Sequence, residues 1–345
     1  MSKIKVFLGG YINYTNAQNL NCRAVAEYLD SNKFEVLVLT THFGENERFE
    51  ANTFNCNRPF IFSKHLGFLW GIFNCDVAYL PKHINTPLWV LKLAKLLKKP
   101  IFTTIEGNVT DLSKPNLIAL FGAENKMKNH FSYFEQVFGI SNFLIQETQS
   151  KISMNDTPLL LGVNVNQFSL KIAQKLRSIV FVGGLVKRKR IEEFLQLAKF
   201  YPQINFNIIG NGPEKNNLEN NASSNVVFNG VLSHARINAI FQQSDLMFLP
   251  AKSEGFPKVI LESASAGIPS VVYNTYGASN WMNDRENGFI VNDLNEVKNV
   301  INELLNDAIL LQKTSEGAVK LAQKFDWKNI IKDWEKVIVD LHNGK

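Results

Sequence analysis

The chain has 345 residues, which exceeds the roughly 250–300 residues at which a single hydrophobic core usually divides, so two domains are expected. Hydrophobic residues make up 45% and charged residues 20% of the chain, a composition that is typical of globular proteins and excludes intrinsic disorder. The net charge of +6 comes without interleaved basic and aromatic residues or a recognisable nucleic-acid module, so nucleic acid is not expected as a partner.

The composition also predicts the cellular compartment of the protein and the residue types of its hydrophobic cores. The three cysteines are scattered and lack metal-ligand spacing, which predicts buried thiols in a reducing environment. No apolar run approaches the length of a membrane span, and the first residues lack the apolar region of a signal peptide. A cytoplasmic protein with phenylalanine-rich cores is therefore expected, since the chain contains 26 phenylalanines.

Strand-like apolar runs alternate with helical periods through most of the chain. The first half predicts strands at 4–10, 34–40, 76–80, 100–105 and 136–140, with helices at 17–29, 87–99 and 115–129. The second half predicts strands at 178–184, 204–212, 225–230, 245–250, 268–273 and 288–291, with helices at 191–200 and 234–243. This alternation predicts an α/β protein of two doubly wound, Rossmann-like domains with parallel sheets.

The domain boundaries follow from where this alternation stops. Strand character fades between 159 and 178, so we place the first domain at 1–168 and the second at 169–325. Further helical periods run from 295 to 323, and a last helix is expected within 326–345. Its apolar residues recur at helical spacing and are Trp327, Ile330, Ile331, Trp334, Val337 and Ile338.

The segment SEGFPKVILESASAGIPSVV, residues 253–272, places two glutamates eight residues apart. It predicts a loop that holds Glu254, then a helix with Pro257 as its first residue and Glu262 about one turn in, then a strand. A helix start favours anions, and a carboxylate beside it fits a ligand that carries both phosphate and hydroxyl groups. A nucleotide sugar is such a ligand.

Glycines follow several of the predicted strands, at the sheet edge where ligands of α/β proteins gather. They are Gly9, Gly10, Gly183, Gly184, Gly210, Gly212, Gly230 and Gly255. Together they indicate that a ligand approaches the backbone at the carboxyl ends of the strands.

Four consecutive segments resemble the glycosyltransferase family 4 group of the glycosyl transferases group 1. They are FVGGLVKRKRIEEFLQLAK, IIGNGPEKNNLE, VVFNGVLSHARINAIFQQSDLMFLPAKSEGFPKVILESASAGIPSVV and YGASNWMNDRENGFIV, within residues 178–292. A weaker resemblance over 1–170 includes FLGG and IFTTIEG. The resemblance implies the GT-B architecture, with an acceptor-side domain and a nucleotide-sugar domain facing a cleft, and a C-terminal helix that crosses back to the first domain.

The resemblance also implies roles for individual residues. Glu262 is expected to bind the ribose hydroxyls, Glu254 to face the donor sugar, and Lys189 to neutralise the diphosphate. Together with Glu106, Glu254 and Lys189 form the expected catalytic set. The backbone expected to border the sugar and diphosphate consists of Gly9, Gly10, Gly183, Gly184, Gly210, Gly255, Phe256, Pro257, Lys258 and Val259.

Three positions differ from the family pattern. Gly184 stands where the family has arginine, Glu106 where it has histidine, and Asn280 where it has glutamate. Lys187, Arg188 and Arg190 are the candidates to replace the missing arginine charge. These differences leave a catalytically weakened nucleotide-sugar sensor or partner subunit as an alternative to an enzyme. A third interpretation keeps the fold but makes the reaction nucleotide-sugar epimerisation, and the family-like segment SEGFPKVILE argues against it.

The implied reaction is transfer of a hexose-type sugar from a UDP- or GDP-linked donor to a glycan or lipid-linked glycan acceptor, with retention of configuration and no metal, in surface polysaccharide assembly. A basic helix at 87–99 allows two interpretations, peripheral contact with the anionic inner face of the cell membrane or packing on the sheet. It is expected to place Lys92, Lys95 and Lys99 opposite an apolar face of Trp89, Leu93 and Leu96. The same two interpretations apply to the apolar segment at 65–73.

Overall fold

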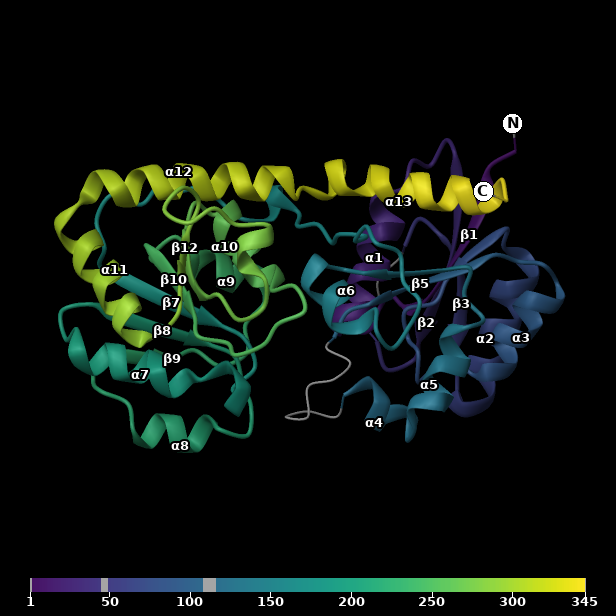
Figure 1. Cartoon of the computed structure of the whole chain (residues 1–345), viewed down its shortest axis with the longest axis horizontal. Helices are drawn as coiled ribbons and strands as arrows, with labels where there is room; N and C mark the ends of the chain where they lie inside the picture. Colours follow the sequence, from purple (N-terminus) through teal and green to yellow (C-terminus); the bar gives the residue numbers. More distant parts are fainter. Residues whose placement is uncertain (1, 45–48, 108–115, 345) are drawn as a thin grey trace. The chain divides into compact units, whose positions relative to one another are not determined.

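The computed structural model describes residues 2–44, 49–107 and 116–344, and the chain divides into two compact units. Unit 1 comprises Met1–Leu161 together with Trp327–Lys345, and unit 2 comprises Gly162–Asp326. Each unit contains one six-stranded sheet (Figure 1). The C-terminal helix α13 (Trp327–His342) therefore belongs to the unit that the N-terminal half of the chain forms.

The sheet of unit 1 is parallel throughout and has the order β3-β2-β1-β4-β5-β6. Its strands are β1 (Ile4–Tyr11), β2 (Phe34–Thr41), β3 (Asn52–Cys56), β4 (Val77–Tyr79), β5 (Ile101–Ile105) and β6 (Gln136–Gly139). The order reverses between β1 and β4, and open α/β sheets bind ligands at the carboxyl ends of the strands beside such a point.

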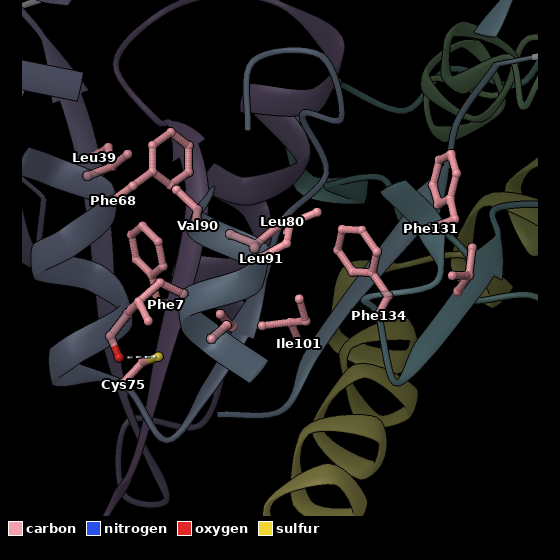
Figure 2. Packing of buried hydrophobic residues seen from close by; sticks show 14 of the residues in the cluster. Phe7, Leu39, Phe68, Cys75, Leu80, Val90, Leu91, Ile101, Phe131 and Phe134 are labelled. Atoms are coloured by element: carbon pink, nitrogen blue, oxygen red, sulfur yellow. Dashed lines mark hydrogen bonds between the residues drawn. The ribbon is translucent and has the colours of Figure 1, made fainter. Parts of the chain in front are cut away.

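Helices cover both faces of this sheet. They are α1 (Ala17–Tyr28), α2 (Phe60–Asn74), α3 (Leu88–Leu96), α4 (Leu117–Phe121), α5 (Glu124–Phe131), α6 (Asn142–Thr148) and α13. Figure 2 shows the core on the α2 and α3 side, where Phe7 of β1 meets Phe68 of α2 with ring centroids 6.1 Å apart. On the other face, Tyr79 of β4 contacts Trp334 of α13 edge-on at 5.0 Å.

The structure corrects four predictions in unit 1. Strand β3 was not predicted, and β1 runs through the glycine pair to Tyr11 instead of ending there. The helix predicted at 115–129 is two helices, α4 and α5, because Gly122 adopts a left-handed φ of 74° between them; Pro115 lies outside the described residues. The apolar face of α3 is also different: Val90, Leu91 and Ala94 are buried, whereas Leu96 is 79% exposed.

The sheet of unit 2 repeats the same parallel arrangement, with the order β12-β11-β10-β7-β8-β9. Its strands are β7 (Ser178–Val182), β8 (Asn205–Ile209), β9 (Val226–Phe228), β10 (Leu246–Leu249), β11 (Ser270–Tyr273) and β12 (Phe289–Val291). All six were predicted from the sequence. The order reverses between β7 and β10, so a second switch point lies there.

The helices of unit 2 are α7 (Ile191–Phe200), α8 (Lys215–Asn220), α9 (His234–Phe241), α10 (Lys258–Ser265), α11 (Leu294–Asn306) and α12 (Ala308–Lys324). The core beneath α7 is aromatic, as the composition predicts. Phe194 of α7 contacts Phe181, Phe206 and Phe248 of three strands, with ring centroids 5.2 to 6.3 Å apart. This packing fixes α7, and with it the loop that joins β7 to α7.

The structure also bears on the cysteines and on membrane-spanning helices. Cys22, Cys56 and Cys75 are free thiols and all three are buried, as predicted. Among the residues that the structure describes, no helix is long and apolar enough to span a membrane.

Candidate functional site

The candidate site of unit 2 lies where its strand order reverses, at the loops that follow β7 and β10. The loop after β7 forms a short 3-10 helix at Lys187–Lys189, and the loop after β10 contains Glu254. The two loops are joined by their backbones, because the N–H of Lys252 donates to the carbonyl of Arg188 at 2.8 Å. Side chains that are distant in sequence are thereby held next to each other.

Arg188, Lys189 and Glu254 form an ion-pair cluster between these two loops. Both cations contact the same carboxylate oxygen, with Lys189 Nζ 2.7 Å and Arg188 Nη1 2.5 Å from Glu254 Oε1. Arg188 Nη1 also donates to the carbonyl of Ser253 at 2.9 Å. The side chain of Lys189 is 8% exposed and that of Glu254 is 12% exposed, so this pair is largely shielded from water, whereas Arg188 is 25% exposed.

The charges of this cluster do not cancel, since two cations share one carboxylate. Burial acts to raise the pKa of Glu254, but Lys189 and Arg188 outweigh it and hold that pKa below its usual value. Burial lowers the pKa of Lys189, and Glu254 opposes that shift. With all three groups charged, one unit of positive charge remains at the switch point, and an anionic group of a ligand would neutralise it.

The backbone around the cluster approaches closely at two glycines. Gly210, which follows β8, has a φ of 142°, and a Cβ atom there would lie 1.9 Å from the carbonyl oxygen of Gly183. A Cβ on Gly183 itself would lie 3.5 Å from Lys189 Nζ. Only glycine fits at Gly210, and Gly183 leaves space directly beside the lysine ammonium.

Helix α10 carries the second glutamate of the pair. It begins at Lys258 with Pro257 as its N-cap, one residue later than predicted, and no side chain caps it. Phe256 is buried against Trp281 and Phe325, with both ring centroids 5.5 Å away. This packing anchors the loop, so that the segment from Gly255 to Val259 presents its backbone, not the ring of Phe256, at the helix start.

Glu262 lies on α10 and is partly buried. Burial raises the pKa of its carboxyl, and Lys258 and His234 oppose that rise. Within the described residues, Glu262 forms no side-chain hydrogen bond or ion pair. A partly buried carboxylate without a protein donor is suited to accept hydrogen bonds from ligand hydroxyls.

Two of the three departures from the family pattern, Gly184 and Asn280, lie in unit 2. Gly184 is exposed, and a Cβ there would meet only the carbonyl of Asn211 at 3.9 Å, so the position has room for a side chain. Asn280 ends the short 3-10 helix Ala278–Asn280 and is exposed. Of the cations proposed to replace the arginine, Arg188 is in the cluster, whereas Lys187 is exposed and Arg190 pairs with Glu193.

The sequence analysis missed a polar group beside the cluster. Tyr276 follows β11 and is 1% exposed, yet its hydroxyl has no hydrogen-bond partner among the described residues. Burial raises its pKa well above the usual value, and the charge of Glu254 adds to that rise. A single tyrosine in YGASN carries no sequence signal for such a position.

The predicted residues of unit 1 lie at its own switch point. Gly9 and Gly10 are buried within β1, where Cβ atoms would lie 2.6 Å from Leu80 Cδ2 and from Cys22 Sγ, so a larger residue at either position would have to displace a packed side chain. Glu106 follows β5 and accepts a hydrogen bond from Asn21 Nδ2 at 3.0 Å. Glu106 and the Lys189–Glu254 pair therefore belong to different units.

No group of three or more histidine, cysteine, aspartate or glutamate side chains among the described residues could hold a metal ion. Metal independence remains a prediction.

Comparison with known sequences finds a family match that lies within unit 2. Residues 163–321 match the family described as Glycosyl transferases group 1. An uncharacterized glycosyltransferase of Haemophilus influenzae is 27% identical over 201 residues, which are 55% of this chain and 57% of that protein. The alpha-galactosylglucosyldiacylglycerol synthase of Streptococcus pneumoniae is 27% identical over 214 residues, which are 58% of this chain and 54% of the synthase. The matches thus span little more than half the length of these relatives.

Comparison with solved structures extends over both units. The Anabaena protein HepE in complex with UDP superposes with a TM-score of 0.77 and 16% identity, covering 98% of this chain and 100% of that one. At this identity the likeness shows the fold alone. Together with the two parallel sheets of identical strand order, it confirms the predicted GT-B fold class.

Proposed function

We propose that the protein is a retaining, metal-independent glycosyltransferase that uses a nucleotide-sugar donor, because residues 163–321 match the family described as Glycosyl transferases group 1. The observation that carries this proposal is the Arg188–Lys189–Glu254 cluster at the switch point of unit 2, with its excess positive charge and its buried Lys189. Glu262 supplies the complementary hydroxyl-binding group on α10.

The donor is assigned to unit 2 by the chemistry of these groups. The diphosphate neutralises the excess charge of the cluster and meets backbone at Gly183 and at the uncapped start of α10. The ribose hydroxyls donate to Glu262. The UDP bound by HepE makes a UDP-linked hexose the first donor to test, with a GDP-linked hexose as the second.

In the proposed reaction, the bond between the anomeric carbon and the β-phosphate oxygen breaks, and a bond forms from that carbon to an acceptor hydroxyl oxygen. The leaving phosphate takes the proton of that hydroxyl on the same face of the sugar, so that configuration is retained. Lys189 stabilises the charge that develops on the phosphate as the bond breaks. Glu254 holds Lys189 in position and faces the sugar.

The acceptor is proposed to be a glycan or a lipid-linked glycan. The support is the synthase of Streptococcus pneumoniae, whose name describes a glycolipid product. We place the reaction in the assembly of a surface polysaccharide or glycolipid.

The activity is tested by incubating the protein with UDP-glucose, UDP-galactose and GDP-mannose in turn and measuring the nucleoside diphosphate released, with and without a glycan mixture. Release that Lys189→Ala abolishes and Lys187→Ala leaves unchanged is the expected result. An α-configured product from an α-linked donor, seen by NMR, would establish retention. Nucleotide binding without any release would favour the sensor or partner subunit, and a donor epimer formed without acceptor would favour epimerisation.

Unit 1 also presents a surface suited to an anionic bilayer, which we define as the outer faces of α2 and α3. Phe62, Leu66 and Phe73 are 70%, 57% and 57% exposed and lie at positions i, i+4 and i+11 of α2, on one side of the helix. Helix α3 packs against α2 and exposes Leu96, with the lysine side chains of Lys92 and Lys95 on the same helix. Exposed apolar side chains bordered by lysines match the interface of an anionic membrane.

This membrane proposal is tested by sedimentation with vesicles of phosphatidylcholine containing phosphatidylglycerol. Wild-type protein is expected to bind them more strongly than pure phosphatidylcholine, and the double variant Phe62→Ser/Leu66→Ser to lose that binding. The matched control is Ile309→Ser on α12, which is 66% exposed in unit 2. Binding that the double variant retains would refute this surface.

A further inference from the structure

Lys82 is a buried cation that neither the sequence analysis nor the proposed reaction uses. It follows β4 at the switch point of unit 1 and is 6% exposed. The adjoining backbone is fixed by α1, because Gln18 Nε2 donates to the carbonyl of Pro81 at 2.8 Å. The lysine therefore projects from a rigid position beside the carboxyl ends of β1 and β4.

The surroundings of Lys82 do not compensate its charge. Its Nζ lies 5.3 Å from the centroid of the Tyr11 ring, and within the described residues it forms no hydrogen bond or ion pair. A cation–π contact stabilises an ammonium far less than its removal from water destabilises it. Burial lowers the pKa of Lys82, and the charge of Glu106 acts in the opposite direction.

Glu106 is the complementary group on the neighbouring strand end. Its Oε2 accepts from Asn21 Nδ2 of α1 at 3.0 Å, and its Oε1 lies 3.4 Å from the hydroxyl of Thr104. These contacts orient the carboxylate, which interacts electrostatically with Lys82 without forming an ion pair with it. An ammonium and a carboxylate are thus held near each other, at the ends of β4 and β5, without neutralising one another by contact.

The hydrogen-bonding chemistry of the Lys82 ammonium and the Glu106 carboxylate indicates which kind of ligand binds there. An ammonium only donates hydrogen bonds and a carboxylate only accepts them, whereas a sugar hydroxyl does both. Two neighbouring hydroxyls of one sugar can therefore accept from Lys82 and donate to Glu106. A phosphate would be repelled by Glu106, and an apolar group would leave Lys82 buried without a partner.

We propose that Lys82 and Glu106 bind neighbouring hydroxyl groups of the acceptor sugar, and that Lys82 is an acceptor-specificity residue of unit 1. This assignment rests on the proposed function, because it takes the second substrate to be a carbohydrate. Glu106, which the sequence analysis placed in the expected catalytic set, thereby receives a binding role together with Lys82.

The test measures binding of methyl α-D-glucopyranoside, methyl α-D-galactopyranoside and methyl N-acetyl-β-D-glucosaminide to the full chain by saturation-transfer difference NMR. At least one glycoside is expected to bind. Lys82→Met and Glu106→Gln are each expected to weaken that binding by about tenfold or more, the range for a hydrogen bond to a charged group. Lys126→Met, which removes an exposed lysine from α5, is the control and should bind like wild type.

Thermal unfolding separates a binding role from a structural one. Replacing an unpaired buried charge by methionine should leave the unfolding midpoint unchanged or raise it. A lowered midpoint in both Lys82→Met and Lys82→Arg would make Lys82 a structural residue and overturn the assignment. Absence of glycoside binding to wild type, or binding that Lys82→Met leaves intact, would overturn it as well.

A nucleotide titration of the same proteins distinguishes this proposal from the proposed function. Lys82→Met should bind UDP or GDP as wild type does, because the donor groups lie in unit 2. Wild-type protein that binds a glycoside through Lys82 but binds no nucleotide would refute the donor assignment and leave this one standing.

Discussion

Units 1 and 2 have the same strand order, but the charged groups at their switch points are arranged differently. In unit 2, Lys189 and Arg188 contact Glu254 directly, and the cluster keeps one excess positive charge. In unit 1, Lys82 and Glu106 interact without contact and have opposite charges. The same topology therefore offers one site suited to an anion and another suited to neutral hydroxyl groups, and the side chains after the strands decide which.

The largest expected effect concerns the stability of unit 1. Trp334 of α13 is fully buried, contacts Tyr79 edge-on, and donates from Nε1 to the carbonyl of Leu160 at 2.9 Å. Trp334→Ala should lower the free energy of unfolding by about 3–5 kcal/mol, as truncation of large buried aromatic residues does. Hydrogen exchange should accelerate in β4 and remain unchanged in β8, with the exposed Lys336→Ala as control. Equal acceleration in both strands would mean that the units unfold together.

The second effect concerns catalysis in unit 2. Lys189→Ala removes the cation that stabilises the leaving phosphate and should reduce turnover by about 10²–10³-fold, the range for a lost oxyanion donor. Lys187→Ala is the matched control, since Lys187 belongs to the same 3-10 helix and is exposed. Steady-state release of nucleotide from the active donor measures both variants. Wild-type turnover in Lys189→Ala would exclude the proposed role.

A third difference between the units is sensitivity to acid. In unit 1, burial lowers the pKa of His83 to about 3 and that of His130 to about 4. The unfolded chain binds protons near pH 6.5 and the folded unit does not, so stability falls as pH decreases through that value. Between pH 7 and pH 5 each histidine should cost roughly 2 kcal/mol.

Hydrogen exchange at pH 7 and pH 5, corrected for intrinsic rates, measures this effect strand by strand. Protection of β5, whose Thr104 carbonyl contacts His83, should fall on acidification. The variant His130→Phe should retain more of its protection at pH 5 than wild type does. Equal acid sensitivity of the two proteins would contradict the assignment to His130.

The smallest expected effect is a gain in nucleotide affinity. Gly184 is exposed, has room for a side chain and does not adopt a left-handed φ, so Gly184→Arg adds a cation beside the cluster without strain. Nucleoside diphosphate should bind about two- to fivefold more tightly, because an exposed charge pair contributes at most about 1 kcal/mol. Calorimetric titration measures it, with Gly184→Ala as control. Weaker binding of Gly184→Arg would show that the position must remain small.

The sequence predicted unit 2 better than unit 1 for physical reasons. The strands of unit 2 are mostly apolar, and five of the six are followed within four residues by glycine or proline, whereas β3 of unit 1 reads NTFNC and is polar at most positions. The sequence KRKR did not predict that Arg188 and Lys189 pair with Glu254. Which of these side chains reach Glu254 depends on the φ and ψ angles of the 3-10 helix at Lys187–Lys189. Lys82 gave no signal, since one lysine after a three-residue strand is common and its burial follows only from packing.

The most direct measurement of the central claim is thermal unfolding with UDP, GDP, ADP and CMP in turn, for wild type, Glu262→Ala and the exposed control Glu219→Ala. A nucleotide that binds only the folded state should stabilise wild type by about 2.7 kcal/mol at a hundredfold excess over its dissociation constant. The account predicts that UDP or GDP raises the midpoint of wild type and Glu219→Ala, and that Glu262→Ala loses the shift. A shift that Glu262→Ala retains, or no shift with any nucleotide, would contradict the assignment of the donor site to unit 2.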